Sequence, residues 1–104
     1  MIKFIALTGF DKNFDNDIQN TFKEVFNKGV FINGENVENF EKNFKKISNS
    51  NYCVTCGNGM DALTIILKSL DLKPNSKILV PAQTFIATYL SITAAGFIPV
   101  PVDV

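Results

Sequence analysis

The feature that most constrains the fold is the alternation of short apolar runs with helical patterns in the second half of the chain. The predicted elements are, in order, a strand at 52–56, a helix over about 60–70, a strand at 77–80, a helix from Thr84 to Ala95 that Gly96 ends, and a strand at 97–102. Strands that alternate with helices form parallel sheets, because each helix carries the chain back to the same end of the sheet. We therefore predict an α/β fold with a mostly parallel sheet flanked by helices.

Two further helices are predicted before this region. Asp15 or Asn16 caps the first, which covers about 16–28 and ends at Gly29, and the second covers about 35–47. Each has an apolar face at helical spacing. The faces consist of Ile18, Phe22, Val25 and Phe26 in the first helix and of Val37, Phe40, Phe44 and Ile47 in the second.

The last strand indicates how the chain is organised into domains. Strand 97–102 is apolar on both faces and therefore requires further cover. We predict a single incomplete domain over residues 1–104, the first part of something longer. Residues 1–48 form an N-terminal arm and two helices, and residues 49–104 begin the α/β part. The arm, 1–14, is predicted to be irregular, with three apolar anchors, Phe4, Ile5 and Leu7.

Composition excludes several classes of function. Ten lysines balance ten acidic residues, so a basic face for nucleic acid is not expected. The chain has no histidine, which excludes a Ser-His-Asp or Cys-His mechanism built from this chain alone and disfavours a zinc site. It has no arginine either, so a bidentate arginine clamp on a phosphate must come from elsewhere.

Two features bear on where the protein works. Cys53 and Cys56 form a C-x-x-C pair, but a second pair of zinc ligands is absent and the pair lies on a predicted strand, so we interpret both as small buried residues. Two free cysteines fit a cytoplasmic protein. No signal peptide is evident, and prolines divide the uncharged segment 78–102, which disfavours a membrane span.

The glycine turn at 57–59 is a candidate anion site. A Gly-x-Gly turn ahead of a helix lets the backbone approach a phosphate, which the first amides and the helix dipole then hold. A tight strand-to-helix turn without a ligand explains the same residues. A dinucleotide-binding fingerprint would place Ala62 in its last glycine position and needs an acid near 77–81, where none occurs. The Gly-Lys-Ser/Thr phosphate loop is also absent.

Four motifs in fixed order are more specific than the turn alone. They are residues 29–34 with Val37, Phe40, Glu41 and Phe44; residues 58–63; residues 78–88; and residues 95–103. From about residue 28 to the end, their order and spacing resemble the DegT/DnrJ/StrS family of sugar aminotransferases. The resemblance implies the type I fold of pyridoxal-phosphate enzymes, with this chain as the start of its large domain.

The resemblance also implies which residues bind pyridoxal 5′-phosphate. Gly59 and Met60 would offer backbone amides to its phosphate, in a turn that also contains Asn58. Phe85 would stack on the pyridine ring, and Gln83 could face the same site. Periodicity alone favours an ordinary core position for Phe85, whereas its place in the third motif favours the ring contact.

The implied activity needs residues that this chain lacks. The resemblance implies a homodimer. In the family, glutamate gives its amino group to the cofactor, and a nucleotide-linked keto-sugar then receives it, in polysaccharide or antibiotic-sugar synthesis. Met60 stands where the family usually has Ser or Thr. A large apolar residue at this position resembles the branch of the family that aminates 3-keto-6-deoxy sugars on dTDP. The Schiff-base lysine and the acid paired with the pyridine nitrogen lie beyond the matched region, so we predict no catalytic residue, and no activity, in residues 1–104 alone.

Three alternatives stay open at this point. The glycine turn could belong to a nucleotide-binding α/β domain. The chain could begin a sugar dehydratase of the same fold that lacks the usual lysine. It could also be a non-catalytic or regulatory relative that packs against a partner.

Overall fold

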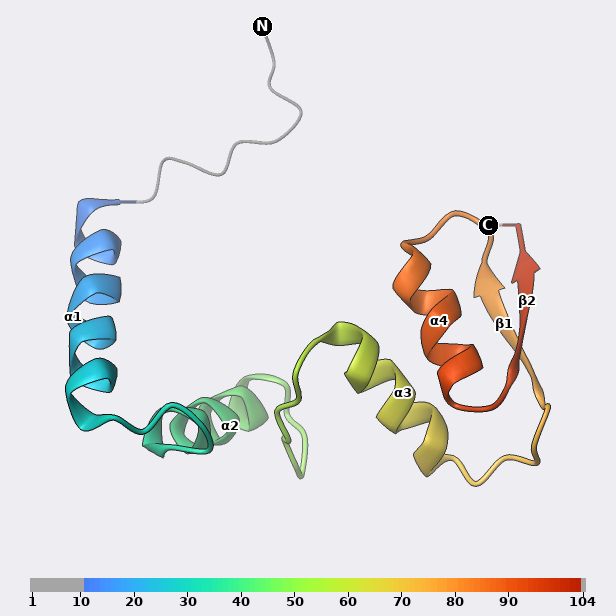
Figure 1. Cartoon of the computed structure of the whole chain (residues 1–104), viewed down its shortest axis with the longest axis horizontal. Coiled ribbons are helices and arrows are strands. Elements are labelled where there is room, and N and C mark those ends of the chain that lie inside the picture. The colour runs from blue at the N-terminus through green and yellow to red at the C-terminus, as the bar shows by residue number, and fades with distance from the viewer. Residues whose placement is uncertain (1–10, 104) are drawn as a thin grey trace, which may run out of the picture. The chain divides into compact units, whose positions relative to one another are not determined.

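The computed structural model describes residues 11–103, which Figure 1 draws in colour. The predicted anchors Phe4, Ile5 and Leu7 lie outside the described residues. The chain divides into two compact units, one that ends at Cys53 and one that begins at Val54. The first unit is helical and the second is α/β.

The first helix, α1, spans Lys12–Lys28. Asp11 caps it, because the Asp11 carboxylate accepts a hydrogen bond from the Asn13 amide at 2.6 Å. The predicted start at 15–16 is therefore wrong by about one turn, and the predicted irregular arm is wrong for its last residues. At the other end, Gly29 has a φ of 66°, a left-handed conformation that glycine adopts without strain, so its predicted role is confirmed.

The second helix, α2, spans Glu35–Ile47, as predicted. Glu35 and Glu38 lie in its first turn, and Lys45 and Lys46 lie in its last. Acids near the N-terminus and bases near the C-terminus of a helix both interact favourably with the helix dipole. Local charge order therefore supports both ends of α2.

The apolar faces of α1 and α2 are present, but most of their side chains are exposed. Phe22 stacks on Phe26 with ring centroids 6.1 Å apart, and Phe40 stacks on Phe44 at 5.6 Å. These pairs bring the rings together without removing them from solvent. An amphipathic helix normally packs its apolar face on other structure, and the described residues of this unit do not supply that cover.

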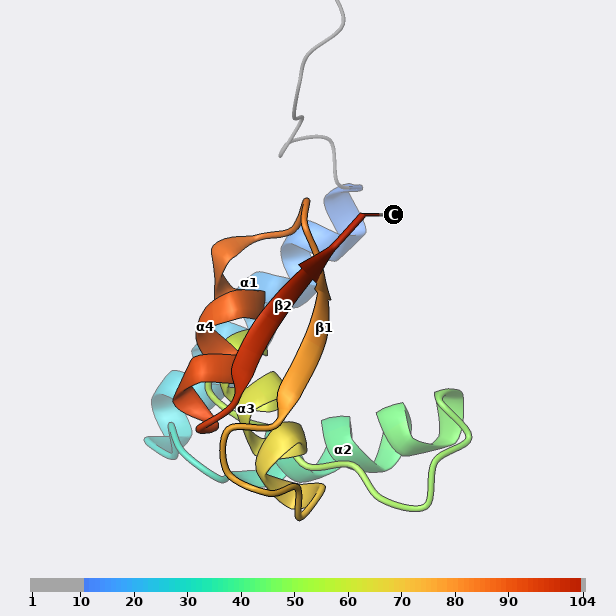
Figure 2. The same ribbon diagram turned by 90° about the vertical axis from the view of Figure 1, so that its right-hand side faces the viewer.

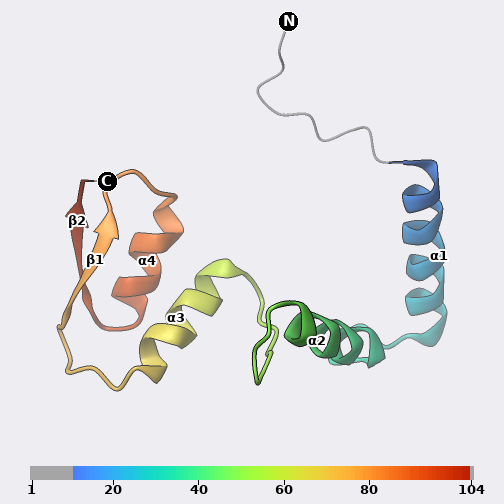
Figure 3. The ribbon, with the colours of Figure 1, turned by 180° about the vertical axis from the view of Figure 1, so that it is seen from behind.

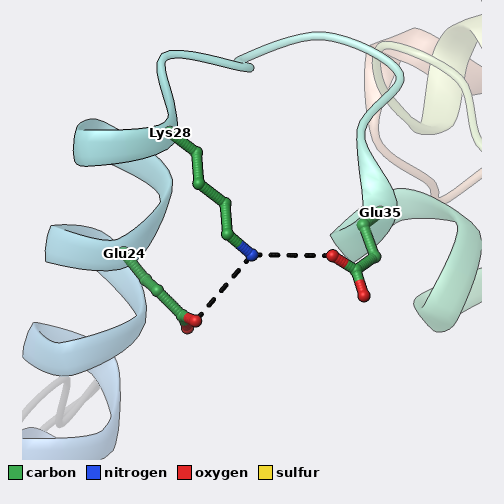
Figure 4. Close-up of polar contacts among 3 residues, drawn as sticks. All are labelled: Glu24, Lys28 and Glu35. Atoms are coloured by element: carbon green, nitrogen blue, oxygen red, sulfur yellow. Dashed lines mark ion pairs between the residues drawn. The ribbon is translucent and has the colours of Figure 1, made fainter.

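Lys28 links the end of α1 to the start of α2 (Figure 4). Its Nζ lies 3.8 Å from Glu24 Oε1 and 3.5 Å from Glu35 Oε2. All three side chains are more than half exposed. Exposed ion pairs of this kind contribute roughly 0–1 kcal/mol each, so they add little to the stability of the connection between the helices.

The second unit is a helix followed by a β-α-β arrangement (Figure 2). Its elements are α3 (Gly59–Ser69), β1 (Lys77–Pro81), α4 (Ile86–Ala94) and β2 (Ile98–Val102). The two strands pair in parallel, with Lys77 opposite Ile98 and Pro81 opposite Val102. The predicted α/β fold with a parallel sheet is confirmed, and α4 is the crossover helix.

The predicted strand at 52–56 does not form. These residues have no regular secondary structure, and the sheet described here contains β1 and β2 alone. A strand exists only where a neighbouring strand exchanges backbone hydrogen bonds with it. The composition of 52–56 is suited to a strand, but among the described residues no neighbour pairs with it.

The helix α4 begins at Ile86 rather than at Thr84. Phe85 occupies the N-cap position and makes no side-chain capping bond. Thr84 does not cap, because its hydroxyl oxygen lies 3.0 Å from that of Thr88, one turn into the helix. At the other end Gly96, with a φ of 87°, ends the helix as predicted.

The core of the second unit lies between α4 and the two strands, which run side by side with it in Figure 3. Its buried hydrophobic residues are Val80, Ile92 and Phe97. Half-buried residues pack around them, namely Leu67, Ile78, Tyr89 and Ala95. Among the apolar residues of α3, Leu67 packs against this core, whereas Ile66 and Leu70 are 55% and 54% exposed.

The uncharged segment 78–102 is divided between β1, α4 and β2, as the prolines predicted. None of the helices formed by residues 11–103 is both long enough and apolar enough to cross a bilayer.

Candidate functional site

An open cavity of about 620 Å³ lies in the second unit, where the starts of α3 and α4 come together. Its lining residues are Asn58, Gly59, Met60, Leu63, Phe85, Ala87 and Thr88. The sequence predicted that the glycine turn and the segment after β1 would meet, and they do line one cavity. The glycine turn follows an irregular segment and not the strand predicted at 52–56.

Asn58 organises the first turn of α3. Its Oδ1 accepts a hydrogen bond from the Asp61 amide at 2.9 Å, and its backbone carbonyl accepts one from the Ala62 amide at 3.1 Å. The amides of Gly59 and Met60 come before these two and have no acceptor within the helix. They are the donors that the start of α3 can offer to a ligand.

Asp61 is an acid in the first turn of α3, where a carboxylate interacts favourably with the helix dipole. Asn58 is the cap, and its Nδ2 donates to Asp61 Oδ2 at 2.9 Å. A side-chain carbon added to Gly57 would lie 2.7 Å from that same oxygen. A side chain at Gly57 would therefore displace the Asp61 carboxylate from its position beside the turn.

Gly59 serves a different purpose from Gly57. A side-chain carbon at Gly59 would meet nothing within 4 Å, so its absence leaves open space at the cavity wall. That space adjoins the amides of Gly59 and Met60, where a ligand can approach the backbone. Met60 itself is half-buried and lines the cavity.

Phe85 is not an ordinary core residue, because 78% of its surface is exposed. It lines the cavity from the N-cap position of α4, and its carbonyl accepts a hydrogen bond from the Thr88 amide at 3.0 Å. The core reading that periodicity favoured is therefore wrong. An exposed aromatic face at a cavity wall can stack on a planar ring.

Gln83 is exposed in the turn between β1 and α4 and is outside the set of residues that lines the cavity. Leu63 and Thr88 line the cavity, although neither was predicted as a site residue. Helical spacing contained the signal: Leu63 follows Gly59 by four positions, and Thr88 follows Phe85 by three, so each shares a helix face with a predicted site residue.

The two cysteines lie outside the cavity lining. Cys53 is half-buried, whereas Cys56 is exposed and its thiol donates to the Asn58 carbonyl at 3.4 Å. The prediction that both are buried is wrong for Cys56, because the strand that would have covered it does not form.

The cavity can bind a ligand, but its lining offers little chemistry. It combines backbone amides at a helix start, an aromatic face and apolar walls. The seven lining residues include no ionisable side chain. Proton transfer or nucleophilic attack at a ligand in this cavity therefore requires groups other than its lining residues.

The chain matches known proteins along nearly its whole length. The model of the DegT/DnrJ/EryC1/StrS aminotransferase family matches residues 12–104. A dTDP-3-amino-3,6-dideoxy-alpha-D-galactopyranose transaminase of Aneurinibacillus thermoaerophilus is 35% identical over 103 residues, which cover 99% of this chain and 28% of that protein. The resemblance predicted from the four motifs is confirmed.

Two solved structures are similar in fold. A DegT DnrJ EryC1 StrS aminotransferase from Brucella abortus has a TM-score of 0.88 at 31% identity, over 100% of this chain and 28% of that chain. NtdA from Bacillus subtilis, with bound cofactor PMP, has a TM-score of 0.83 at 34% identity, over 91% of this chain and 22% of that chain. The chain thus spans about a quarter of the length of these relatives.

Proposed function

The chain belongs to the DegT/DnrJ/EryC1/StrS aminotransferase family, and on that premise we propose that it is the N-terminal part of a pyridoxal-phosphate enzyme. The enzyme moves an amino group from glutamate to a nucleotide-linked keto-sugar. The observation that carries the proposal is the cavity in which the start of α3 meets Phe85. The α/β unit would begin the large domain of a type I fold.

The residues at the start of α3 fit a phosphate group. The amides of Gly59 and Met60 have no acceptor within the helix, and the helix dipole favours an anion at this end. The open space beside Gly59 admits a ligand to those amides. We assign Gly59 and Met60 to the cofactor phosphate, and Asn58 to the turn that presents them.

The opposite wall of the cavity fits a planar heterocycle. Phe85 lines it with a largely exposed ring, and the cavity volume of about 620 Å³ is in the range of small-molecule sites. Pyridoxal phosphate, when bound, supplies the electron sink on which amino transfer depends. Phe85 would orient the pyridine ring by stacking, and the apolar walls would exclude water. We also propose that Gln83, which lies in the turn between β1 and α4, faces this site.

Catalytic groups are expected outside this chain. None of the lysines among residues 11–103 lines the cavity, and Lys68 and Lys73 are exposed at the end of α3 and after it. A Schiff-base lysine and an acid for the pyridine nitrogen must therefore come from other residues. Residues 1–104 alone are expected to be inactive.

The sugar substrate is proposed from Met60 and from the relatives. Met60 lines the cavity where a hydroxyl-bearing residue is usual in the family, and a matching relative is named for a dTDP-linked 3-amino-3,6-dideoxy sugar. We propose a 3-keto-6-deoxy sugar on dTDP as the acceptor. The enzyme would act in the cytoplasm as a homodimer, a state that the exposed apolar faces of α1 and α2 support.

The test uses the complete protein that contains this chain. After incubation with pyridoxal phosphate it should retain an absorbance band of bound cofactor and transfer nitrogen from glutamate to a dTDP-linked 3-keto-6-deoxyhexose. Residues 1–104 alone are the matched control and should show no turnover. Binding of a dinucleotide without any bound pyridoxal phosphate would instead support the nucleotide-binding alternative. Cofactor binding without amino transfer would support a dehydratase or regulatory relative.

A further inference from the structure

Phe85 obtains little support from its own side-chain packing, because 78% of its surface is exposed. The direction of its ring therefore depends on the backbone of the turn that joins β1 to α4. The strand side of the turn is held by the Ala82 amide, which donates to the Val102 carbonyl at 2.8 Å. The helix side is held by the Thr88 amide, which donates to the Phe85 carbonyl at 3.0 Å.

Tyr89 connects the two sides of this turn. Its ring packs against the buried cluster in the core of this unit. Its hydroxyl donates to the carbonyls of Pro81 at 3.2 Å and Ala82 at 3.3 Å, a three-centre hydrogen bond. The second turn of α4 is thereby tied to the last residue of β1 and the first residue after it.

We propose that Tyr89 is a positioning residue, which acts through Phe85 to align the aromatic wall of the cofactor cavity. The inference rests on the proposed function, because it requires that Phe85 stacks on the cofactor ring. Packing alone does not explain the residue type, since phenylalanine fills the same half-buried position. The hydroxyl makes the contacts that tie α4 to the end of β1, and Tyr89 lies outside the set of residues that lines the cavity.

Tyr89 provides one of two hydroxyl contacts that hold the turn. The hydroxyls of Thr84 and Thr88 lie 3.0 Å apart and close the same turn beside Phe85. Loss of the Tyr89 hydroxyl therefore should not unfold the turn. It should widen the range of directions that the Phe85 ring samples, and this lowers affinity for a planar ligand because more of the ring's freedom is lost on binding.

The test measures binding of pyridoxamine phosphate to the complete protein carrying Tyr89→Phe, a change that keeps the ring and removes the hydroxyl. The dissociation constant should rise about three- to tenfold, the effect of one ordinary hydrogen bond. The increase in melting temperature on adding pyridoxamine phosphate should shrink. Thr93→Val is the matched control, because it removes a hydroxyl that donates to the backbone carbonyls of Leu90 at 3.0 Å and Tyr89 at 3.5 Å and leaves the Tyr89 hydroxyl in place. Its dissociation constant should equal that of the wild type.

A double variant separates positioning from general stability. If Tyr89 acts through Phe85, Tyr89→Phe should not weaken binding further in a Phe85→Leu background. Independent, additive losses would overturn the inference, as would a Tyr89→Phe protein that melts earlier but binds with unchanged affinity. A wild-type protein that binds no pyridoxamine phosphate would overturn the proposed function and the inference together. Normal binding by both wild type and Tyr89→Phe would overturn the inference alone.

Discussion

Replacing Asn58 by alanine tests whether this side chain builds the start of α3, where we propose that the cofactor phosphate binds. The Asn58 side chain makes two hydrogen bonds to Asp61, one to its amide and one to its carboxylate, both at 2.9 Å. Loss of an asparagine cap costs about 1 kcal/mol. That energy corresponds to roughly a fivefold larger population of the opened first turn.

Amide hydrogen exchange of the complete protein measures this opening directly. In Asn58→Ala, the Ala62 amide should exchange about fivefold faster than in the wild type, because local opening exposes it more often. The Asp61 amide should exchange faster still, because it also loses the Asn58 oxygen that accepts its hydrogen bond. Exchange in α4 should be unchanged. Asn36→Ala is a matched control, since Asn36 is an exposed asparagine in the first turn of α2.

Two further substitutions separate the acceptor from the donor of Asn58. Asn58→Ser keeps a capping oxygen and loses the Nδ2 donor, so most of the protection should return. Asn58→Asp also keeps the acceptor but turns a second carboxylate toward Asp61, and it should protect less than serine because like charges repel. Wild-type exchange rates at Asp61 and Ala62 in Asn58→Ala would refute the assignment of the cap.

Two more predictions concern the two walls of the cavity, and both are measured with pyridoxamine phosphate. Phe85→Leu keeps an apolar side chain but removes the aromatic stack, so the dissociation constant should rise about two- to tenfold while the melting temperature without ligand stays constant. Gly59→Ala should raise the melting temperature without ligand, because alanine favours a helix over glycine by up to about 1 kcal/mol and the new methyl group meets nothing within 4 Å. The same methyl group stands beside the amides that we propose bind the phosphate, and it should weaken binding about tenfold or more, the effect of losing a hydrogen bond to a charged group. Unchanged affinity in Gly59→Ala would show that the phosphate does not bind at this turn.

The elements that sequence patterns predicted well are those set by neighbours in the chain. Both bounds of α2 match, and the glycines that end α1 and α4 have the left-handed φ values expected of them. Charge order, helical spacing and the conformational freedom of glycine act over a few residues. The start of α1 was missed although the signal was local: Phe14 precedes Ile18 by four positions and extends the apolar face toward the Asp11 cap.

The strand at 52–56 was wrong for a different reason. Its composition indicates only that the segment tolerates an extended conformation. Whether it becomes a strand depends on a neighbour elsewhere in the fold, and β1 pairs with β2 in the described sheet. The glycine turn formed nevertheless, because the Asn58 cap and the Gly57 contact to Asp61 are contained within five residues. The cavity-lining turn is thus a local structure, whereas the strand ahead of it is not.

The phenylalanines show what decides between a core residue and a site residue. Phe85 and Phe97 are both apolar, lie twelve positions apart and flank the same helix, so composition and periodicity treat them alike. Phe97 is 8% exposed because it follows α4 on the side that packs against the strands, and Phe85 is 78% exposed because it precedes α4 at the cavity. Leaving a large aromatic ring exposed at the end of a well-packed helix forgoes about 2 kcal/mol of burial. That energy is recovered only when a ligand in the cavity covers the Phe85 ring. We therefore expect the Tyr89 hydroxyl, which holds the turn at Phe85, to affect ligand binding more than folding.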